Sequence, residues 1–250
     1  MSAPLVGFER VGVTLAGVEV LRDMSLAVRP GEFVALVGPS GCGKTTLLNV
    51  ASGWLSPTAG VVSRPPRLRM VFQQDGLFPW KTVDENVALG LRHLPEGAPR
   101  EARKTALLTL IGLTGFERHY PHQLSGGMRQ RVELARALGG DTDVLLMDEP
   151  FSSLDYLTRF KMRHELAGLL REQPRTVLLV THDIEEAAQL ADRVLVLTER
   201  PARVRCEITI GTPRPRALTQ PDVVHAVHRI LTELGLETDE PSTARAVQER

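Results

Sequence analysis

Short runs of consecutive apolar residues recur along the chain, and such runs are typical of strands buried on both faces of a sheet. They occupy residues 33–37, 70–72, 143–147 and 176–180. A helical pattern at 157–172 separates the last two runs, so this part of the chain predicts a βαβ unit. Upstream, residues 18–38 indicate strands interrupted by a turn at Arg29-Pro30-Gly31.

The middle of the chain carries a helical pattern instead. Between about residues 80 and 140, apolar positions recur at helical spacing in VDENVALGL, ARKTALLTLIGL and SGGMRQRVELARAL. These segments predict a helical insertion that splits an α/β core. After Gly211, a proline cluster precedes an amphipathic helix, and we expect residues 237–250 to be frayed or disordered. The apolar face of that helix is predicted to contain Val223, Val227, Ile230, Leu231 and Leu234.

Composition narrows the class of protein. With 250 residues, 42% of them apolar, the chain can bury a substantial core in one large domain or two small ones. Lys+Arg and Asp+Glu number 30 each, so no net charge points to nucleic acid or an anionic membrane. Two cysteines argue against a disulfide scaffold. We recognise no signal peptide and no apolar run near the roughly 20 residues of a membrane span, so work at a membrane would require a partner.

A glycine-rich segment, GPSGCGKT, matches the phosphate-binding pattern G-x-x-x-x-G-K-[ST]. It follows a predicted strand and precedes a predicted helix, where backbone N–H groups and the helix N-terminus bind phosphates. We expect Lys44 to contact the β- and γ-phosphates and the Thr45 hydroxyl to ligate Mg²⁺. Cys42 is interpreted as a small loop residue, because no general base accompanies it. The predicted nucleotide-binding residues of this segment are Gly38, Pro39, Ser40, Gly41, Cys42, Gly43, Lys44, Thr45 and Thr46.

Two carboxylates follow the apolar run at 143–147. Asp148 is predicted to hold Mg²⁺ in the position of a Walker B acid, and Glu149 to take a proton from the attacking water. A solvated turn is the ordinary interpretation of an isolated Asp-Glu pair. The preceding strand and the upstream phosphate loop favour the catalytic interpretation.

Two further residues follow predicted strands. His182 comes two residues after the run at 176–180, at the strand end where open α/β sheets bind ligands, and it is placed to contact the γ-phosphate. Gln73 follows the run at 70–72, where it can touch Mg²⁺ or the attacking water, with an ordinary surface glutamine as the alternative. Together with Glu149, these residues are the catalytic candidates.

The segment LSGGMRQR, residues 124–131, looks like a second phosphate-binding turn at the start of a helix. Ser125 is predicted to cap this helix, which leaves the N–H groups of Gly126 and Gly127 at its positive end. The chain therefore carries two phosphate-binding turns and one set of hydrolytic residues.

The motifs GPSGCGKTT, FQQ, LSGGMRQR, LLMDEP, SSLD and VTHD stand in the order found in ATP-binding cassette (ABC) ATPase subunits. The chain resembles this family over about residues 6–235. The resemblance implies an α/β fold: a RecA-like P-loop NTPase core with a mostly parallel sheet, an N-terminal antiparallel β-subdomain and an inserted ABC-type α-helical subdomain. It divides the single domain into a nucleotide-binding core at about 1–78 and 140–211, a helical subdomain at 79–139 and a tail at 212–250.

The resemblance also implies ATP and Mg²⁺ as ligands and a head-to-tail homodimer. Each ATP would lie between the P-loop of one subunit and the signature turn, Ser125, Gly126 and Gly127, of the other. Asp155, in the D-loop SSLD, would contact the opposite subunit at this nucleotide interface.

Two positions depart from the family pattern. Leu15, with Val20 nearby, stands where many relatives have an aromatic side chain that stacks on adenine. Met128 replaces the usual signature glutamine and is placed to pack with Val132 and Ala135 at helical spacing instead.

Residues 76–87 and the tail PRPRALTQPD are similar to the nitrate/sulfonate/taurine branch of importers. This likeness implies that ATP hydrolysis powers uptake of a small anion through two transmembrane permease subunits, supplied by a solute-binding protein. It places the chain at the cytoplasmic face of the inner membrane, as a peripheral subunit without a nucleic-acid partner. Phe78 and Trp80 are interpreted either as a docking patch for a permease or as a buried core pair.

Two other functions remain as alternatives. A soluble ABC ATPase of DNA repair or translation would need a long coiled-coil insertion or a second cassette, and the sequence contains neither. A P-loop kinase for a small molecule would have no use for a signature turn, a D-loop or a glutamate that activates water. These features favour the importer ATPase.

Overall fold

The computed structural model describes residues 3–72 and 76–236, so the predictions for Gln73 and for residues 237–250 lie outside the described residues. Within the described residues, the larger sheet has six strands in the order β5-β6-β7-β3-β8-β9. The first five are parallel, and β9 pairs antiparallel with β8 at the edge. The strands are β3 (Phe33–Val37), β5 (Leu68–Val71), β6 (Val144–Asp148), β7 (Thr176–Val180), β8 (Arg193–Leu197) and β9 (Val204–Thr209).

The parallel strands are apolar throughout because both faces of the sheet are covered. Along β3, Phe33, Ala35 and Val37 point into one hydrophobic core, while Val34 and Leu36 point into the other. This alternation follows from the two-residue period of a strand. The sheet therefore separates two hydrophobic cores.

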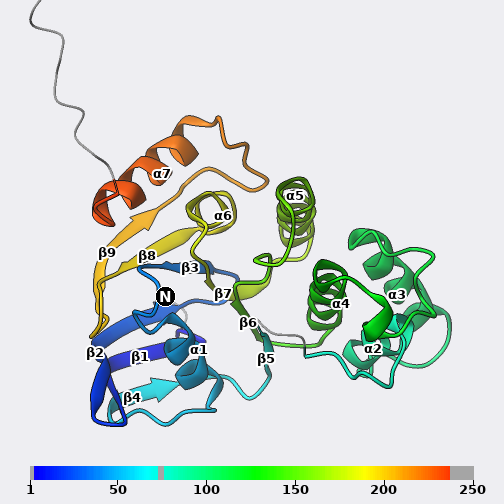
Figure 1. Ribbon diagram of the computed structural model, residues 1–250, viewed down its shortest axis with the longest axis horizontal. Helices are drawn as coiled ribbons and strands as arrows, with labels where there is room; N and C mark the ends of the chain where they lie inside the picture. Colours follow the sequence, from blue (N-terminus) through cyan, green and yellow to red (C-terminus); the bar gives the residue numbers. More distant parts are fainter. Residues whose placement is uncertain (1–2, 73–75, 237–250) are drawn as a thin grey trace, which may run out of the picture.

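A smaller antiparallel sheet, in the order β2-β1-β4, covers one of these cores (Figure 1). Helix α1 (Lys44–Ser52) lies between the two sheets, and its Leu47 and Leu48 are buried there. Gly60 of β4 has a φ of +79°, and a Cβ atom at this position would lie 2.4 Å from the Arg10 carbonyl oxygen. Only glycine lets the two strands approach so closely. The strands are β1 (Val6–Leu15), β2 (Val18–Val28) and β4 (Ala59–Ser63).

The helices α5 (Tyr156–Glu172), α6 (Ile184–Leu190) and α7 (Pro221–Glu233) cover the other core. The predicted βαβ unit is present as β6-α5-β7, with its two strands adjacent and parallel. The predicted amphipathic helix is α7, which buries Val223, Ala226 and Ile230.

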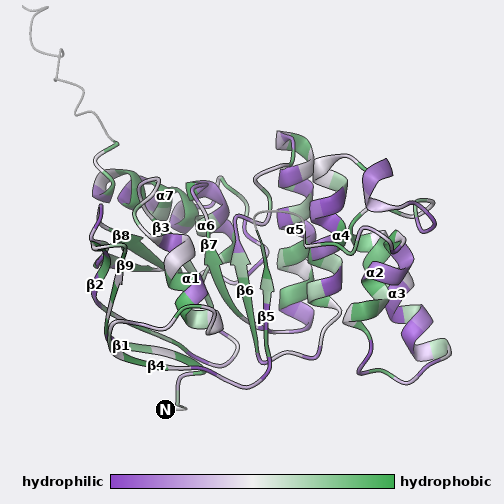
Figure 2. Ribbon diagram, turned by 60° about the horizontal axis from the view of Figure 1, so that its bottom comes forward, coloured by the Kyte–Doolittle hydropathy of each residue, from purple (hydrophilic) through white to green (hydrophobic). Residues whose placement is uncertain are grey.

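The inserted helices lie beside β5, at the edge of the larger sheet, in both views (Figures 1 and 2). They are α2 (Val83–Gly90), α3 (Ala98–Leu110), a short 3₁₀ turn at Pro121–Gln123 and α4 (Gly126–Leu138). A capping box between Thr82 and Glu85 starts α2. Gly90 lets α2 and α4 pack closely, since a Cβ atom there would lie 2.1 Å from the Arg136 carbonyl oxygen.

The predicted fold class is confirmed, with a mostly parallel sheet, an antiparallel β-subdomain and a helical insertion. Two predicted strands have different bounds: the strand predicted at 143–147 runs from Val144 to Asp148, and the strand predicted at 70–72 runs from Leu68 to Val71. Among the described residues, none of the helices has the length and apolar character needed to cross a membrane.

Candidate active site

The carboxyl ends of three neighbouring parallel strands bring the predicted motifs to one edge of the larger sheet. β3 leads into residues 38–46, β6 ends at Asp148, and His182 follows two residues after β7. Asp148 is in register with Val180, and the Glu149 N–H donates to the Val180 carbonyl oxygen at 2.9 Å. Open parallel sheets bind their ligands at this edge. Apart from Gln73, the predicted catalytic residues therefore come together.

The glycine-rich loop before α1 folds around the side chain of Lys44. Its ammonium group donates to the carbonyl oxygens of Gly38 and Pro39, at 2.8 and 2.9 Å. Gly43 has a φ of +123°, and a Cβ atom there would lie 2.9 Å from a methyl carbon of Val20. The loop thus keeps a buried cation beside the backbone that is expected to bind phosphates, and it can do so only with glycine at position 43.

Cys42 and Val20 are packing residues of the glycine-rich loop and its surroundings. Cys42 is buried, and burial raises the pKa of its thiol, so the group stays protonated at neutral pH and is a poor nucleophile. Val20 is buried against the loop, whereas Leu15 is 40% exposed. The interpretation of Cys42 as a small loop residue is supported.

Asp148 and Thr45 offer oxygen atoms suited to a divalent cation. Asp148 is buried, and burial raises its pKa, although a hydrogen bond with the Thr45 side chain acts in the opposite direction. Its Oδ1 atom has no hydrogen-bond partner among the described residues. A buried carboxylate oxygen without a partner next to a hydroxyl group fits Mg²⁺, which prefers hard oxygen ligands and takes the remainder from phosphates and water.

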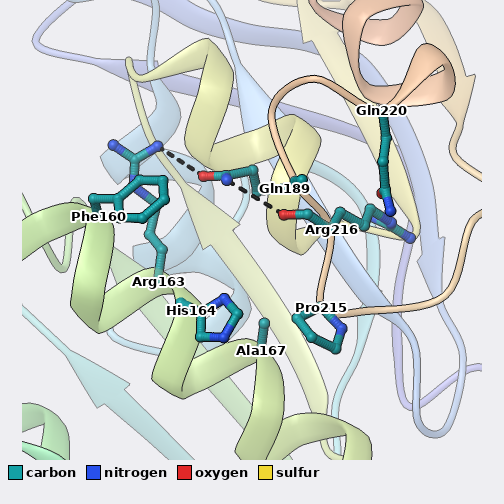
Figure 3. A pocket seen from close by; sticks show the side chains of 9 residues that line it. Phe160, Arg163, His164, Ala167, Gln189, Pro215, Arg216 and Gln220 are labelled. Carbon is teal, nitrogen blue, oxygen red and sulfur yellow. Dashed lines mark hydrogen bonds between the residues drawn. The ribbon is translucent and has the colours of Figure 1, made fainter.

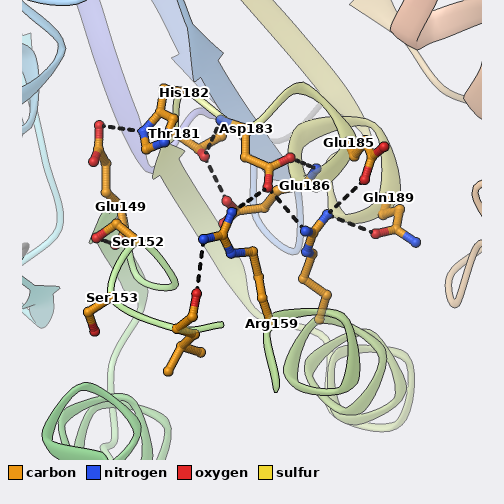
Figure 4. Close-up of polar contacts among 12 residues, drawn as sticks. Glu149, Ser152, Ser153, Arg159, Thr181, His182, Asp183, Glu185, Glu186 and Gln189 are labelled. Atoms are coloured by element: carbon orange, nitrogen blue, oxygen red, sulfur yellow. Dashed lines mark hydrogen bonds and ion pairs between the residues drawn. The ribbon is translucent and has the colours of Figure 1, made fainter. Parts of the chain in front are cut away.

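Glu149 and His182 contact each other directly (Figure 4). His182 Nδ1 lies 3.1 Å from Glu149 Oε1, and the histidine side chain is 59% exposed. Glu149 also has a φ of +48°, in the left-handed region that non-glycine residues rarely adopt. Such conformations concentrate at functional sites, where the surrounding structure maintains them. The geometry therefore pairs the two predicted catalytic side chains on a strained backbone.

A polar cluster that the sequence analysis did not predict lies behind His182 (Figure 4). Asp183 caps α6 and accepts hydrogen bonds from Arg159 and Arg163, at 3.2 and 3.1 Å. The Thr181 hydroxyl donates to Glu186 at 2.7 Å, and burial raises the pKa of Glu186 to about 8. The spacing of Asp183 and Glu186 signals a helix start, but the burial of Glu186 depends on tertiary packing that the local sequence does not encode.

A cavity of about 410 Å³ lies outside this site, between α5, α6 and the segment that precedes α7 (Figure 3). Arg163 donates to Gln189 at 3.2 Å, and Gln189 donates to the Arg216 carbonyl oxygen at 3.4 Å. These bonds tie the segment that precedes α7 to α5 and α6.

The signature turn begins α4, as predicted. The Ser125 hydroxyl accepts a hydrogen bond from the Met128 N–H at 3.2 Å, so Ser125 is the N-cap. The N–H groups of Gly126 and Gly127 belong to the first turn, which has no intrahelical acceptors. A Cβ atom on Gly127 would lie 2.9 Å from Leu154, so α4 starts directly against the D-loop.

Two other family positions have structural roles in this chain. Asp155 caps α5 by accepting the Thr158 N–H at 3.0 Å, a bond that also lowers the pKa of Asp155. Met128 packs against the hydrophobic core that contains Val132 and Ala135, as the helical spacing predicts. Met128, which stands at the position of the usual signature glutamine, is thus a packing residue.

Phe78 and Trp80 form a pair on the surface. Their ring centroids are 5.5 Å apart, and the Arg136 guanidinium lies 5.8 Å from the Phe78 ring. Trp80 is 69% exposed and Phe78 40% exposed. The interpretation as a buried core pair is wrong, because neither ring is covered by the packed helices.

Comparisons with known proteins agree with this geometry. The family model described as ABC transporter matches residues 21–152. The aliphatic sulfonates import ATP-binding protein SsuB 1 of Rhodococcus jostii is 49% identical over 224 residues, which cover 86% of this chain and 89% of that protein. The taurine import ATP-binding protein TauB of Yersinia pestis is 48% identical over 198 residues, covering 75% and 77%.

Solved structures agree as well. The dimeric structure of the bacterial ABC transporter cassette MJ0796 matches with a TM-score of 0.73 and 33% identity, covering 83% of this chain and 99% of that one. A post-hydrolysis state of the same cassette, bound to ADP and Pi, gives a TM-score of 0.72 at 32% identity. None of these similar proteins is named as a kinase or as a repair or translation protein, so the two alternatives are not supported. The chain belongs to the ABC transporter family, as an ATP-binding cassette with ATPase activity.

Proposed function

We propose that this chain is the ATPase subunit of an importer for small organic sulfonates, working as a homodimer on two permease subunits at the cytoplasmic face of the inner membrane. The observation that carries the hydrolytic part is the contact between Glu149 and His182 beside Asp148 and the phosphate loop. The sulfonate part rests on the likeness to SsuB 1 and TauB, whose names specify aliphatic sulfonates and taurine.

In this proposal the residues at the strand ends divide the chemistry of hydrolysis. Lys44 exchanges its two carbonyl partners for the phosphates of ATP. The Glu149 carboxylate accepts a proton from the attacking water, and His182 orients that carboxylate while its exposed ring faces the γ-phosphate. Thr45 and Asp148, together with Gln73, would hold Mg²⁺. When bound, Mg²⁺ offsets the negative charge that develops on the phosphates.

The second phosphate-binding turn has its role in the dimer. The N–H groups of Gly126 and Gly127, with Ser125, would meet the γ-phosphate of an ATP molecule held by the partner, and Asp155 would lie at the same interface. ATP would then join the subunits, and hydrolysis would loosen them because a charge leaves the interface. The dimeric state of MJ0796 supports this arrangement.

In this proposal, each part of the chain has a separate role, and one exposed pair of side chains contacts another subunit. Residues 1–78 and 140–211 form the nucleotide-binding core, residues 79–139 the helical subdomain, and 212–250 the tail. The exposed aromatic pair of Phe78 and Trp80 would contact a permease subunit. A separate solute-binding protein would deliver the sulfonate to the permeases.

Growth on defined sulfur sources tests the proposal. A deletion strain of the source organism should grow normally on sulfate and fail on taurine or an alkanesulfonate as the sole sulfur source. The wild-type gene should restore growth, and a Glu149→Gln gene should not. Unimpaired growth of the deletion strain on sulfonates, or a defect on nitrate as the nitrogen source instead, would reject the assigned substrate class.

A further inference from the structure

Gln130 is a buried polar residue of α4 that lies outside the predicted set of site residues. It is 4% exposed and lies five residues after Ser125. Its amide nitrogen donates to the Glu149 carbonyl oxygen at 3.0 Å. Its amide oxygen accepts from both the N–H and the hydroxyl of Ser153, at 3.2 and 2.5 Å. A buried amide used at both ends fixes the relative positions of the groups that it joins.

The backbone that Gln130 holds is the strained one. Glu149 has a φ of +48°, which is costly for a residue with a Cβ atom and persists only where neighbours enforce it. The Glu149 carbonyl oxygen accepts hydrogen bonds from the Ser152 N–H and hydroxyl, at 3.1 and 3.0 Å, as well as from Gln130. The two Ser152 bonds are local to the turn. Gln130 supplies a bond from a separate element, the signature helix.

Close packing accompanies these bonds. A Cβ atom on Gly127 would lie 2.9 Å from Leu154 Cδ2 and 3.3 Å from the Ser153 carbonyl oxygen. The first turn of α4 therefore has no free space against residues 153–154. A shift of α4 relative to the sheet would displace the backbone of both Ser153 and Glu149, because closely packed contacts of this kind transmit displacement.

We propose that Gln130 is a positioning residue for ATP hydrolysis, which holds the backbone of Glu149 so that the carboxylate of the same chain is aimed at the attacking water. This inference rests on the proposed role of Glu149 as the base. Because α4 begins with the signature turn, Gln130 also links the turn that would bind the partner's ATP to the chain's own Glu149. Each subunit would thereby adjust its own hydrolysis to the nucleotide held by its partner.

Two substitutions separate the bonds that Gln130 makes. Gln130→Glu keeps the shape, and its ionised form can accept the Ser153 bonds but cannot donate to the Glu149 carbonyl. Gln130→Met keeps a similar length and loses all the bonds. Both variants should lower kcat by about tenfold to a hundredfold, because a misplaced base slows proton transfer, while KM for ATP stays within about threefold.

A matched control shows whether loss of any buried glutamine has this effect. Gln189→Met removes bonds of 3.2 and 3.4 Å to Arg163 and to the Arg216 carbonyl. Gln189 lies at the opposite end of the polar cluster from Glu149 (Figure 4). This variant should melt at a lower temperature than the wild type and keep kcat within about twofold, since ordinary buried hydrogen bonds contribute to stability.

The measurements are steady-state ATPase kinetics, thermal melting and nucleotide titration on the full-length purified chain. The inference is overturned if folded Gln130→Met keeps kcat within about twofold of the wild type, or if its defect lies in KM alone. It is also overturned if Gln189→Met loses kcat to the same extent. Glu149→Gln, measured alongside, separates the proposed base from the proposed positioning residue. Normal turnover by Glu149→Gln rejects the base, whereas an inactive Glu149→Gln together with an active Gln130→Met rejects only the positioning role.

Discussion

The two phosphate-binding turns of this chain differ in where their polar groups point. At the loop before α1, Lys44 is 7% exposed and bonded to backbone carbonyls, and Asp148 is 3% exposed nearby. At the start of α4, Ser125 is exposed and the N–H groups of Gly126 and Gly127 have no intrahelical acceptors. The helices that follow the two turns, α1 and α4, lie on different sides of β5 and β6 in both views (Figures 1 and 2).

This difference indicates how the residues for one reaction can be divided between two surfaces of the same chain. In the first turn, the Lys44 ammonium group is hydrogen-bonded to the backbone carbonyl oxygens of its own loop. A nucleotide that binds Lys44 must therefore replace these hydrogen bonds. The second turn leaves the N–H groups of Gly126 and Gly127 without intrahelical acceptors, and in the proposed dimer the nucleotide of the partner supplies an acceptor. In the proposed dimer, hydrolysis then depends on two chains, although each chain contains every residue type that the reaction needs. Three tests probe this division, from the largest expected effect on ATP turnover to the smallest.

Substitution of the proposed base should have the largest effect. Glu149→Gln keeps the shape of the side chain but cannot accept a proton at neutral pH, so hydrolysis should fall by about 10²–10⁴-fold while ATP binding persists. ATP should then accumulate between two subunits, and light scattering should report a stable dimer. Lys44→Ala is the matched control, because it leaves the phosphate charge unmatched and should stay monomeric with ATP. Normal turnover by Glu149→Gln would contradict the assignment of Glu149 as the base.

Mixed dimers test the outward turn, with an effect near twofold. Lys44→Ala should disable the ATP site of its own chain, and Ser125→Arg should disable the site of the partner. Placed on opposite chains, the two changes affect one site and should leave one bound ATP per dimer. Placed on the same chain, they should leave none.

The two subunits are joined by a peptide linker so that every arrangement stays paired, and the nucleotide retained per linked pair after rapid gel filtration distinguishes the two arrangements. Ser125→Thr is the control, because it keeps a hydroxyl cap on α4 and should retain both sites. The reverse pattern, with ATP retained only in the same-chain arrangement, would show that the signature turn serves its own chain.

Much of the catalytic edge is predictable from sequence because its determinants are local. The phosphate loop needs glycines and a lysine at fixed spacing, and Asp148, Glu149 and His182 follow apolar strands whose carboxyl ends must meet in a parallel sheet. The N-cap role of Ser125 is predictable for the same reason, since it depends on the residues of one helix turn.

The remaining features depend on contacts between distant segments. Gln130 and Glu149 are 19 residues apart, and their hydrogen bond exists only once α4 packs against the end of β6. The apolar character of Phe78 and Trp80 does not predict whether they are exposed, because the packing of α2 and α4 decides their exposure. The left-handed φ of Glu149 carries no sequence signal, since glutamate does not favour that region.

The last test leaves ATP turnover aside and concerns whether water reaches the polar cluster behind His182. Burial raises the pKa of Glu186 from 4.5 to about 8, so the folded protein binds a proton that the unfolded chain releases across this range. The stabilisation from the protonated acid is complete below pH 4.5 and is lost as pH rises towards about 8.

Glu186→Gln keeps the shape, removes the titration and should abolish this dependence. The free energy of unfolding of the wild type, measured relative to the variant, should therefore fall with rising pH by at most roughly 1.4 kcal/mol per pH unit, and it should level off above the folded pKa. Urea unfolding of both proteins across this pH range provides the measurement. A constant difference between them would mean that water reaches Glu186, and that the catalytic edge is as open to solvent as the signature turn.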